Sequence, residues 1–162
     1  MTNLVDFLRT AQLGPLRCGL KRAEVLALLG SEMYWDGMPE GRDQAYCWKY
    51  GALEVRFEHD AMAMFGLYFY TSLAVPACLK PTGFFPSHVP VQRTTLVEFA
   101  EYMREHQIPF ETRSSRSTPF VTQAGVRIIG GQDFEQAFDQ HIVASVIYAC
   151  PGTECAADLG NF

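Results

Sequence analysis

Two stretches of the sequence decide the fold. They read Leu16-Arg-Cys-Gly-Leu-Lys-Arg-Ala-Glu-Val-Leu-Ala-Leu-Leu-Gly30 and Trp48-Lys-Tyr-Gly-Ala-Leu-Glu-Val-Arg-Phe57. The first predicts a helix over 21–29, because its apolar residues supply one buried side and Gly30 readily adopts the positive φ at which many helices end. The second predicts a β-hairpin of 45–50 and 52–58, because apolar and charged residues alternate after the glycine turn. Together they favour an α+β domain.

The remaining segments extend this pattern in both directions. Apolar spacing predicts helices over 2–12 and 94–107, and Thr95 with Glu98 forms a capping-box pair at the start of the second. Strands are expected over 62–70, beginning at Phe110, and over 141–149. A pair of strands is expected within 120–129, and a short helical turn over 132–139. We therefore expect helices packed on one face of a curved antiparallel sheet, in one domain over 1–150 followed by a frayed tail over 151–162.

The chain also divides into two parts that resemble one another. Thr2-Asn-Leu-Val-Asp-Phe7 resembles Thr94-Thr-Leu-Val-Glu-Phe99, and each part reads as a helix followed by antiparallel strands. The parts would be 1–75 and 94–150, joined by a proline-rich connection over 76–93. Two explanations stay open: related halves, or unrelated α+β segments that share common turn chemistry.

Composition excludes several classes of protein. The 162 residues carry a net charge of −5, and no basic cluster is longer than Lys21-Arg22, so nucleic acid is not an expected partner. Neither a signal-peptide pattern nor an apolar run of membrane-spanning length is present, which predicts a cytoplasmic protein that does not enter the membrane. The five scattered cysteines are then expected to be reduced, although pairing of Cys150 with Cys155 stays open.

No pattern in the sequence points to catalysis. His59-Asp60 falls at an expected hairpin turn, and His106 at a helix C-terminus, where a cation is favourable. Glu98, Glu101 and Glu105 read as a solvated helix face. No metal-binding spacing and no phosphate-binding glycine loop occurs, so we expect no enzyme activity, no cofactor and no metal.

A loop over 31–44 is the remaining candidate site. It places Tyr34 and Trp35 among acidic residues, and aromatic side chains of this kind dominate binding energy at protein interfaces. Acidic neighbours would steer a basic partner. The alternative is that Trp35 covers the core while the acids only aid solubility. The candidate partner-binding residues are Tyr34, Trp35, Asp36, Glu40 and Asp43.

The helix signature carries a resemblance. Gly19-Leu-x4-Val25-Leu-x-Leu-Leu-Gly30, with Glu24, resembles the corresponding helix of outer-membrane assembly lipoproteins and of the β-lactamase-inhibitor-like fold, although Leu20 replaces the usual Met. With the lead helix, the Tyr50–Phe57 strand and the second Thr-Leu-x-Glu-Phe helix, the pattern over about 1–148 resembles small cytosolic immunity proteins of bacterial polymorphic toxin systems. The resemblance implies a protein that binds a cognate toxin and occludes its active site. The acidic charge balance favours a toxin with a basic surface. The alternative is a small-ligand-binding or regulatory domain with an apolar pocket, suggested by the many Phe, Tyr and Met residues.

Overall fold

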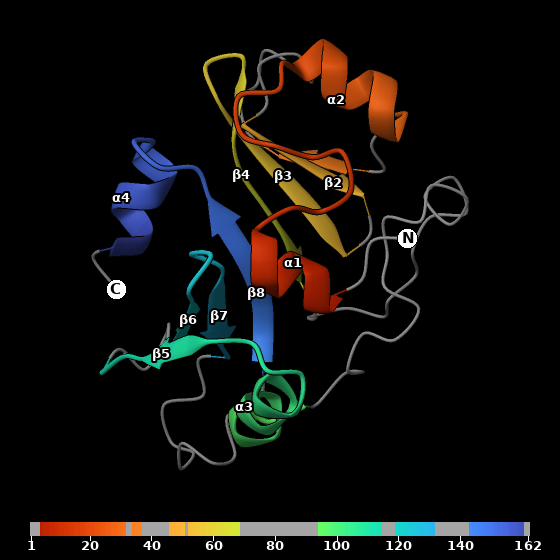
Figure 1. Ribbon diagram of the computed structural model, residues 1–162. Helices are drawn as coiled ribbons and strands as arrows, with labels where there is room; N and C mark the ends of the chain where they lie inside the picture. The colour runs from red at the N-terminus through yellow and green to blue at the C-terminus, as the bar shows by residue number, and fades with distance from the viewer. Residues whose placement is uncertain are drawn as a thin grey trace.

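The computed structural model describes residues 4–31, 34–36, 46–50, 52–68, 94–114, 119–131 and 143–160 (Figure 1). Helices within these ranges are α1 (Leu4–Thr10), α2 (Arg22–Leu29), α3 (Leu96–Glu105) and α4 (Glu154–Gly160). The strands of the first part are β1 (Tyr34–Asp36), β2 (Cys47–Tyr50), β3 (Leu53–Glu58) and β4 (Ala61–Tyr68). Those of the second part are β5 (Phe110–Thr112), β6 (Phe120–Thr122), β7 (Arg127–Gly130) and β8 (Val143–Ala149).

All described strands join one sheet, in the order β1-β2-β3-β4-β8-β7-β6-β5. Every pairing is antiparallel. The first four strands follow one another as a meander, the last four as a second meander, and the two meet where β4 pairs with β8, with Gly66 opposite Ile147. The α+β prediction with an antiparallel sheet is confirmed, as are the hairpin of β2 with β3 and the turn at Ala124-Gly125. The expected helical turn over 132–139 and the connection over 76–93 lie outside the described residues.

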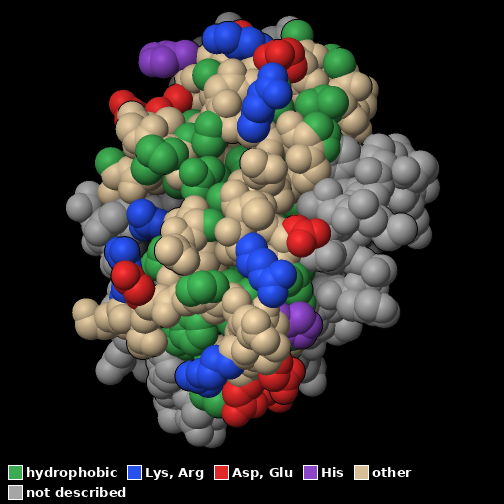
Figure 2. All heavy atoms as spheres, viewed as in Figure 1, with side chains coloured by type: hydrophobic (Ala, Val, Ile, Leu, Met, Phe, Trp, Pro, Cys, Tyr) green, Lys and Arg blue, Asp and Glu red, His purple; other side chains and the backbone are tan. Residues whose placement is uncertain are grey.

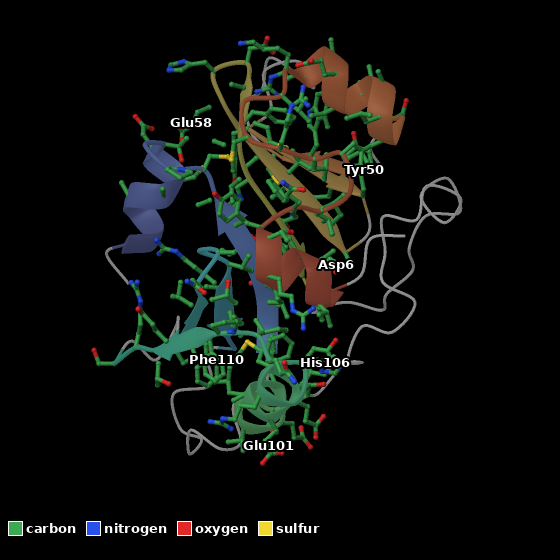
Figure 3. All side chains as sticks on the ribbon, viewed as in Figure 1. Asp6, Tyr50, Glu58, Glu101, His106 and Phe110 are labelled. Carbon is green, nitrogen blue, oxygen red and sulfur yellow. A yellow bond between two sulfur atoms is a disulfide. The ribbon has the colours of Figure 1, made fainter. Side chains whose placement is uncertain are left out.

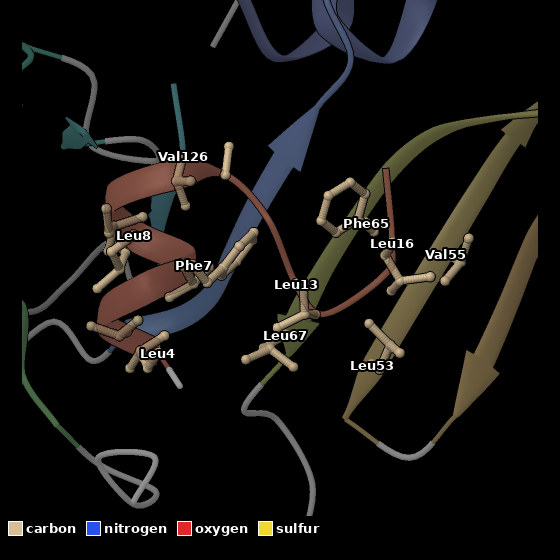
Figure 4. Close-up of a cluster of buried hydrophobic side chains, with 14 of the residues drawn as sticks. Leu4, Phe7, Leu8, Leu13, Leu16, Leu53, Val55, Phe65, Leu67 and Val126 are labelled. Carbon is tan, nitrogen blue, oxygen red and sulfur yellow. The ribbon is translucent and has the colours of Figure 1, made fainter. Parts of the chain in front are cut away.

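Helices α1, α2 and α3 cover one face of the sheet, called here the inner face. Phe7 of α1 packs against Phe65 of β4 with ring centroids 5.9 Å apart, and Figure 4 shows α1 and Leu13 lying over this part of the sheet. The inner core draws on every helix on this face and on both meanders. Its fully buried members include Leu4, Phe7, Leu8, Val25, Trp48, Tyr50, Val55, Phe65, Leu96, Phe99, Met103, Ile128 and Val146.

The opposite, outer face carries a second apolar cluster of Met64, Ile147 and Ala149, and α4 covers it. The prediction of a frayed tail is therefore wrong for 154–160. Thr153 caps this helix: its hydroxyl accepts from the Ala156 amide and donates to the Cys150 carbonyl.

The cap of α3 forms as the sequence predicts. The Thr95 hydroxyl accepts from the Glu98 amide at 3.2 Å, while the Glu98 carboxylate accepts from the Thr95 amide at 2.8 Å. These hydrogen bonds lower the pKa of Glu98. At the other end His106 caps the helix, and Arg9 of α1 donates to the His106 carbonyl, joining the first helices of the two parts.

A disulfide joins Cys18 to Cys150, across 132 residues of sequence and a Cα–Cα distance of 5.6 Å. This overturns the expectation that all cysteines are reduced. Spacing along the chain could not reveal this pair. Cys18 lies in the connection before α2 and Cys150 at the end of β8, and the two come together only because both segments lie beside the start of β4 in the folded sheet. Among the described residues, Cys47 and Cys155 are not part of a disulfide.

None of the helices in the described ranges combines the length and the apolar character needed to cross a membrane.

Candidate functional site

The predicted site residues fall at the first edge of the sheet. Tyr34, Trp35 and Asp36 form β1, whose register places Tyr34 opposite Lys49, Trp35 opposite Trp48 and Asp36 opposite Cys47. The prediction that 31–44 is entirely loop is therefore wrong at 34–36. Glu40 and Asp43, the other two candidates, lie outside the described residues.

Strand β1 ends the sheet on this side. It pairs with β2, and no other strand of the described ranges pairs with it. An edge strand offers backbone N–H and C=O groups that a strand from another chain can pair with. Within the described residues, the backbone of the predicted aromatic and acidic stretch therefore lies at an edge of the sheet.

Next to β1, the outer face carries an ionic cluster of Lys49, Glu54 and Arg56. Glu54 is only 7% exposed, although the alternation of β3 predicts that it faces water. Its Oε1 lies 3.0 Å from Lys49 Nζ, directly across the β2–β3 ladder, and its Oε2 lies 3.6 Å from Arg56 Nη2. A buried carboxylate needs such partners to offset its lost hydration. The cluster holds two cations around one carboxylate, so it is net positive.

Cys47 borders this cluster but is poorly suited to nucleophilic chemistry. Burial raises the pKa of its thiol to about 12, and the neighbouring Glu54 charge adds to the rise. The thiol donates to Glu54 Oε2 at 3.7 Å. Because the thiolate is the reactive form, this cysteine stays protonated and inert at neutral pH.

Tyr46 is a candidate contact residue that the sequence reading missed. It is 45% exposed, one of two large apolar side chains so exposed among the described residues. The Arg56 guanidinium lies over the Tyr46 ring, 6.0 Å from its centroid. The Tyr46 carbonyl accepts a hydrogen bond from the Phe57 amide at 2.8 Å. Tyr46 lies one residue before β2, near the edge strand, and no pattern in the sequence pointed to it.

On the inner face, Arg22 of α2 contacts both residues of the His59-Asp60 pair. Its guanidinium lies 4.3 Å from the Phe57 ring centroid and donates to the His59 carbonyl at 3.1 Å. Asp60 Oδ1 lies 3.8 Å from Arg22 Nε. The histidine has a φ of 56° in the turn between β3 and β4, so the turn prediction is confirmed. These contacts tie α2 to the sheet and bring no acid–base pair into a pocket.

The carboxylates of α3 and the carboxylate of Glu58 lie away from this edge. The exposed carboxylates of α3 gather at the far end of the molecule, as Figure 2 shows over α3, and they match the expected solvated face. Glu58, labelled in Figure 3 beside α4, accepts from the Cys155 amide at 2.7 Å. Burial opposes its ionisation, but hydrogen bonds from the Cys155 and Glu154 amides outweigh burial and lower its pKa.

Within the described ranges, no three His, Cys, Asp or Glu side chains gather in an arrangement that could hold a metal ion. Comparisons with known proteins found no matching family model, no matching curated protein and no matching solved structure.

Proposed function

We propose that this chain is an immunity-type protein, which binds a cognate bacterial toxin and neutralises it by covering the toxin's active site. One observation carries the proposal: the aromatic and acidic stretch Tyr34–Asp36 forms the terminal strand of the sheet, beside the exposed Tyr46. The resemblance of the longer pattern over about 1–148 to immunity proteins supports it. No enzymatic step is part of the proposal.

The contact would combine strand addition with side-chain anchoring. Backbone groups of an edge strand pair with an extended partner segment, and aromatic side chains beside that strand supply most of the binding energy. Lys49 and Arg56, both about one-third exposed, would add charged contacts at the margin of this surface. Such marginal charges affect specificity and association rate more than affinity.

The net charge of −5 indicates a toxin with a basic surface, drawn in by the field of the whole molecule. The charges at this edge are mixed, because the cations Lys49 and Arg56 lie on β2 and β3, beside the strand whose sequence includes Asp36. A partner that fits would therefore be basic overall and carry acidic groups where it meets β2 and β3.

The test is co-expression with the product of the adjacent gene, followed by calorimetry of the purified pair. Protection of cells from that product, with binding at 1:1, supports the function. Trp35→Ala should weaken binding by about 2 kcal/mol, roughly 30-fold, and Asp36→Lys should slow association. Glu111→Lys, on the exposed β5 strand at the opposite edge, is the matched control and should leave affinity unchanged.

Two results would contradict the proposal in different ways. Equal affinity of the Trp35→Ala variant and the unmodified protein would reject the β1 surface while leaving the toxin partner in place. Failure to protect cells from the neighbouring product, together with capture of a small apolar ligand, would favour the ligand-binding alternative.

A cytoplasmic location remains part of this proposal, and the Cys18–Cys150 disulfide bears on it. Disulfides persist mainly in oxidising compartments, whereas cytosolic thiols are kept reduced. Alkylation of intact cells before lysis, followed by mass analysis, would report whether the bond is formed where the protein resides.

A further inference from the structure

The Cys18–Cys150 bond connects the layers on the two faces of the sheet. Cys18 lies in the connection between α1 and α2, whose Leu16 and Leu20 are buried in the inner core. Cys150 directly follows β8 and leads into α4, which covers the outer face. The bond passes around the start of β4, where Gly19 donates to the Met62 carbonyl and Cys150 to the Ala63 carbonyl.

Among the side chains that the structure describes, few others anchor helix α4. It has seven residues, and an isolated helix of that length is not stable in water. Besides the disulfide before its cap, its described contacts are the hydrogen bonds from the Cys155 and Glu154 amides to Glu58, and the packing of Cys155 and Ala156 against the second apolar cluster. Small side chains bury little apolar area, so each of these contacts is weak.

The bond is also accessible from one side. Cys18 is exposed, whereas Cys150 is 3% exposed. A thiol reagent from solution can therefore approach Cys18, with the Cys150 sulfur as the leaving group. Accessible disulfides are the ones that exchange with solution thiols.

We propose that the Cys18–Cys150 bond is a redox-controlled clamp on α4, and that its reduction by a dithiol releases α4 and uncovers Met64, Ile147 and Ala149. One thiolate of the dithiol attacks Cys18 Sγ, and Cys150 leaves as a thiolate that takes up a proton. The second thiol of the reductant then attacks the reductant sulfur that is bonded to Cys18. This closes the reductant's disulfide and releases the Cys18 thiol. The protein gains two electrons and two protons, and the dithiol becomes a disulfide.

Hydrogen exchange of the full chain, followed by mass spectrometry, tests the clamp. The protein is purified under oxidising conditions, its disulfide is confirmed by a mass lower by two hydrogens than that of the reduced chain, and exchange is compared with and without dithiothreitol. Reduction should raise exchange over 154–160 roughly tenfold or more, while α3 and β7 keep their protection. Cys155→Ser in both samples prevents thiol reshuffling within 150–155.

Cys18→Ser is the matched variant, because it removes the bond but keeps Cys150 in place. It should show fast exchange over 154–160 with and without reductant. If this variant does not fold, wild-type protein reduced after folding gives the same comparison. Unchanged exchange over 154–160 after reduction overturns the proposal. An equal rise in α3 and β7 also overturns it, since the bond would then support the whole fold. A purified protein with only free thiols overturns it as well.

Discussion

The two parts of the molecule have the same plan but different outer faces. In the first part α1 precedes the meander β1–β4, and in the second α3 precedes the meander β5–β8. The outer face of the first part carries the ionic cluster around Glu54, whereas that of the second carries Ile147 and Ala149 under α4. The comparison teaches that one scaffold arrangement can carry two kinds of outer face: the second part is covered by α4, and the first carries an ionic cluster near the edge strand β1.

The first helices of the two parts are buried in the same way. Leu4 and Phe7 of α1 are 1% and 0% exposed, and Leu96 and Phe99 of α3, which occupy the matching places in the repeated sequence, are 0% and 1% exposed. An internal duplication would produce this arrangement. The duplication itself stays a prediction, since shared turn and cap chemistry also leads to helices of this kind.

The largest expected effect is at the seam between the parts. A Cβ at Gly66 of β4 would lie 2.7 Å from the Val146 carbonyl oxygen and 2.8 Å from Ile147 Cα, both backbone atoms of β8. Gly66→Ala should therefore cost about 1–3 kcal/mol of unfolding free energy by forcing the central strands apart. Urea unfolding followed by circular dichroism measures this loss.

The form of that transition decides whether the two parts are one folding unit. A single transition at a lower midpoint is expected, because the parts share one inner core. The double variant Gly66→Ala/Ile147→Ala is the control, since it removes the close approach to Ile147 Cγ2 but leaves the backbone contacts. Two separate transitions would show that the parts fold independently.

A smaller effect compares the helix caps of the two parts. Thr95 caps α3 through its hydroxyl, whereas Lys21 stands at the N-cap of α2, where its ammonium can only donate and makes no side-chain cap. Thr95→Ala should lose about 1 kcal/mol of stability, and Lys21→Ser should gain about 0.5 kcal/mol. Thermal unfolding of both variants checks the opposite signs; a loss in both would mean that Lys21 serves another role.

The smallest effect concerns Glu58 at the base of α4. Because its pKa is lowered below the ordinary value of 4.5, its hold on α4 is present above that value and is lost as the pH falls through the lowered pKa. The amide resonance of Cys155 in nuclear magnetic resonance should titrate with a midpoint below 4.5. Glu58→Gln should abolish the titration; persistence of the same titration in that variant would point to another carboxyl.

The elements that the sequence predicts well rest on local chemistry. Thr95 and Glu98 cap each other within four residues, Gly30 takes a φ of 77° directly after α2, and the β2–β3 hairpin closes over one turn. Each of these depends on neighbours in the chain, so the pattern of residues is sufficient to predict it.

The features missed by sequence reasoning depend on distant partners. Strand β1 has three residues and forms because β2 lies beside it, and α4 is a short helix that packs over Met64 and Ile147. Burial of Glu54 and pairing of Cys18 with Cys150 likewise follow from the assembled sheet. The edge position of the candidate site and its neighbour Tyr46 therefore appear only in the fold.

The disulfide also determines how the molecule would respond to a pulling force. Because it joins Cys18 to Cys150, the oxidised chain is a covalent ring with a free segment at each end. Tension applied at residues 1 and 162 would pass through the sulfur–sulfur bond and leave the β4–β8 seam unloaded. An oxidised molecule should therefore extend only by its terminal segments, whereas a reduced one should unravel along nearly its full length.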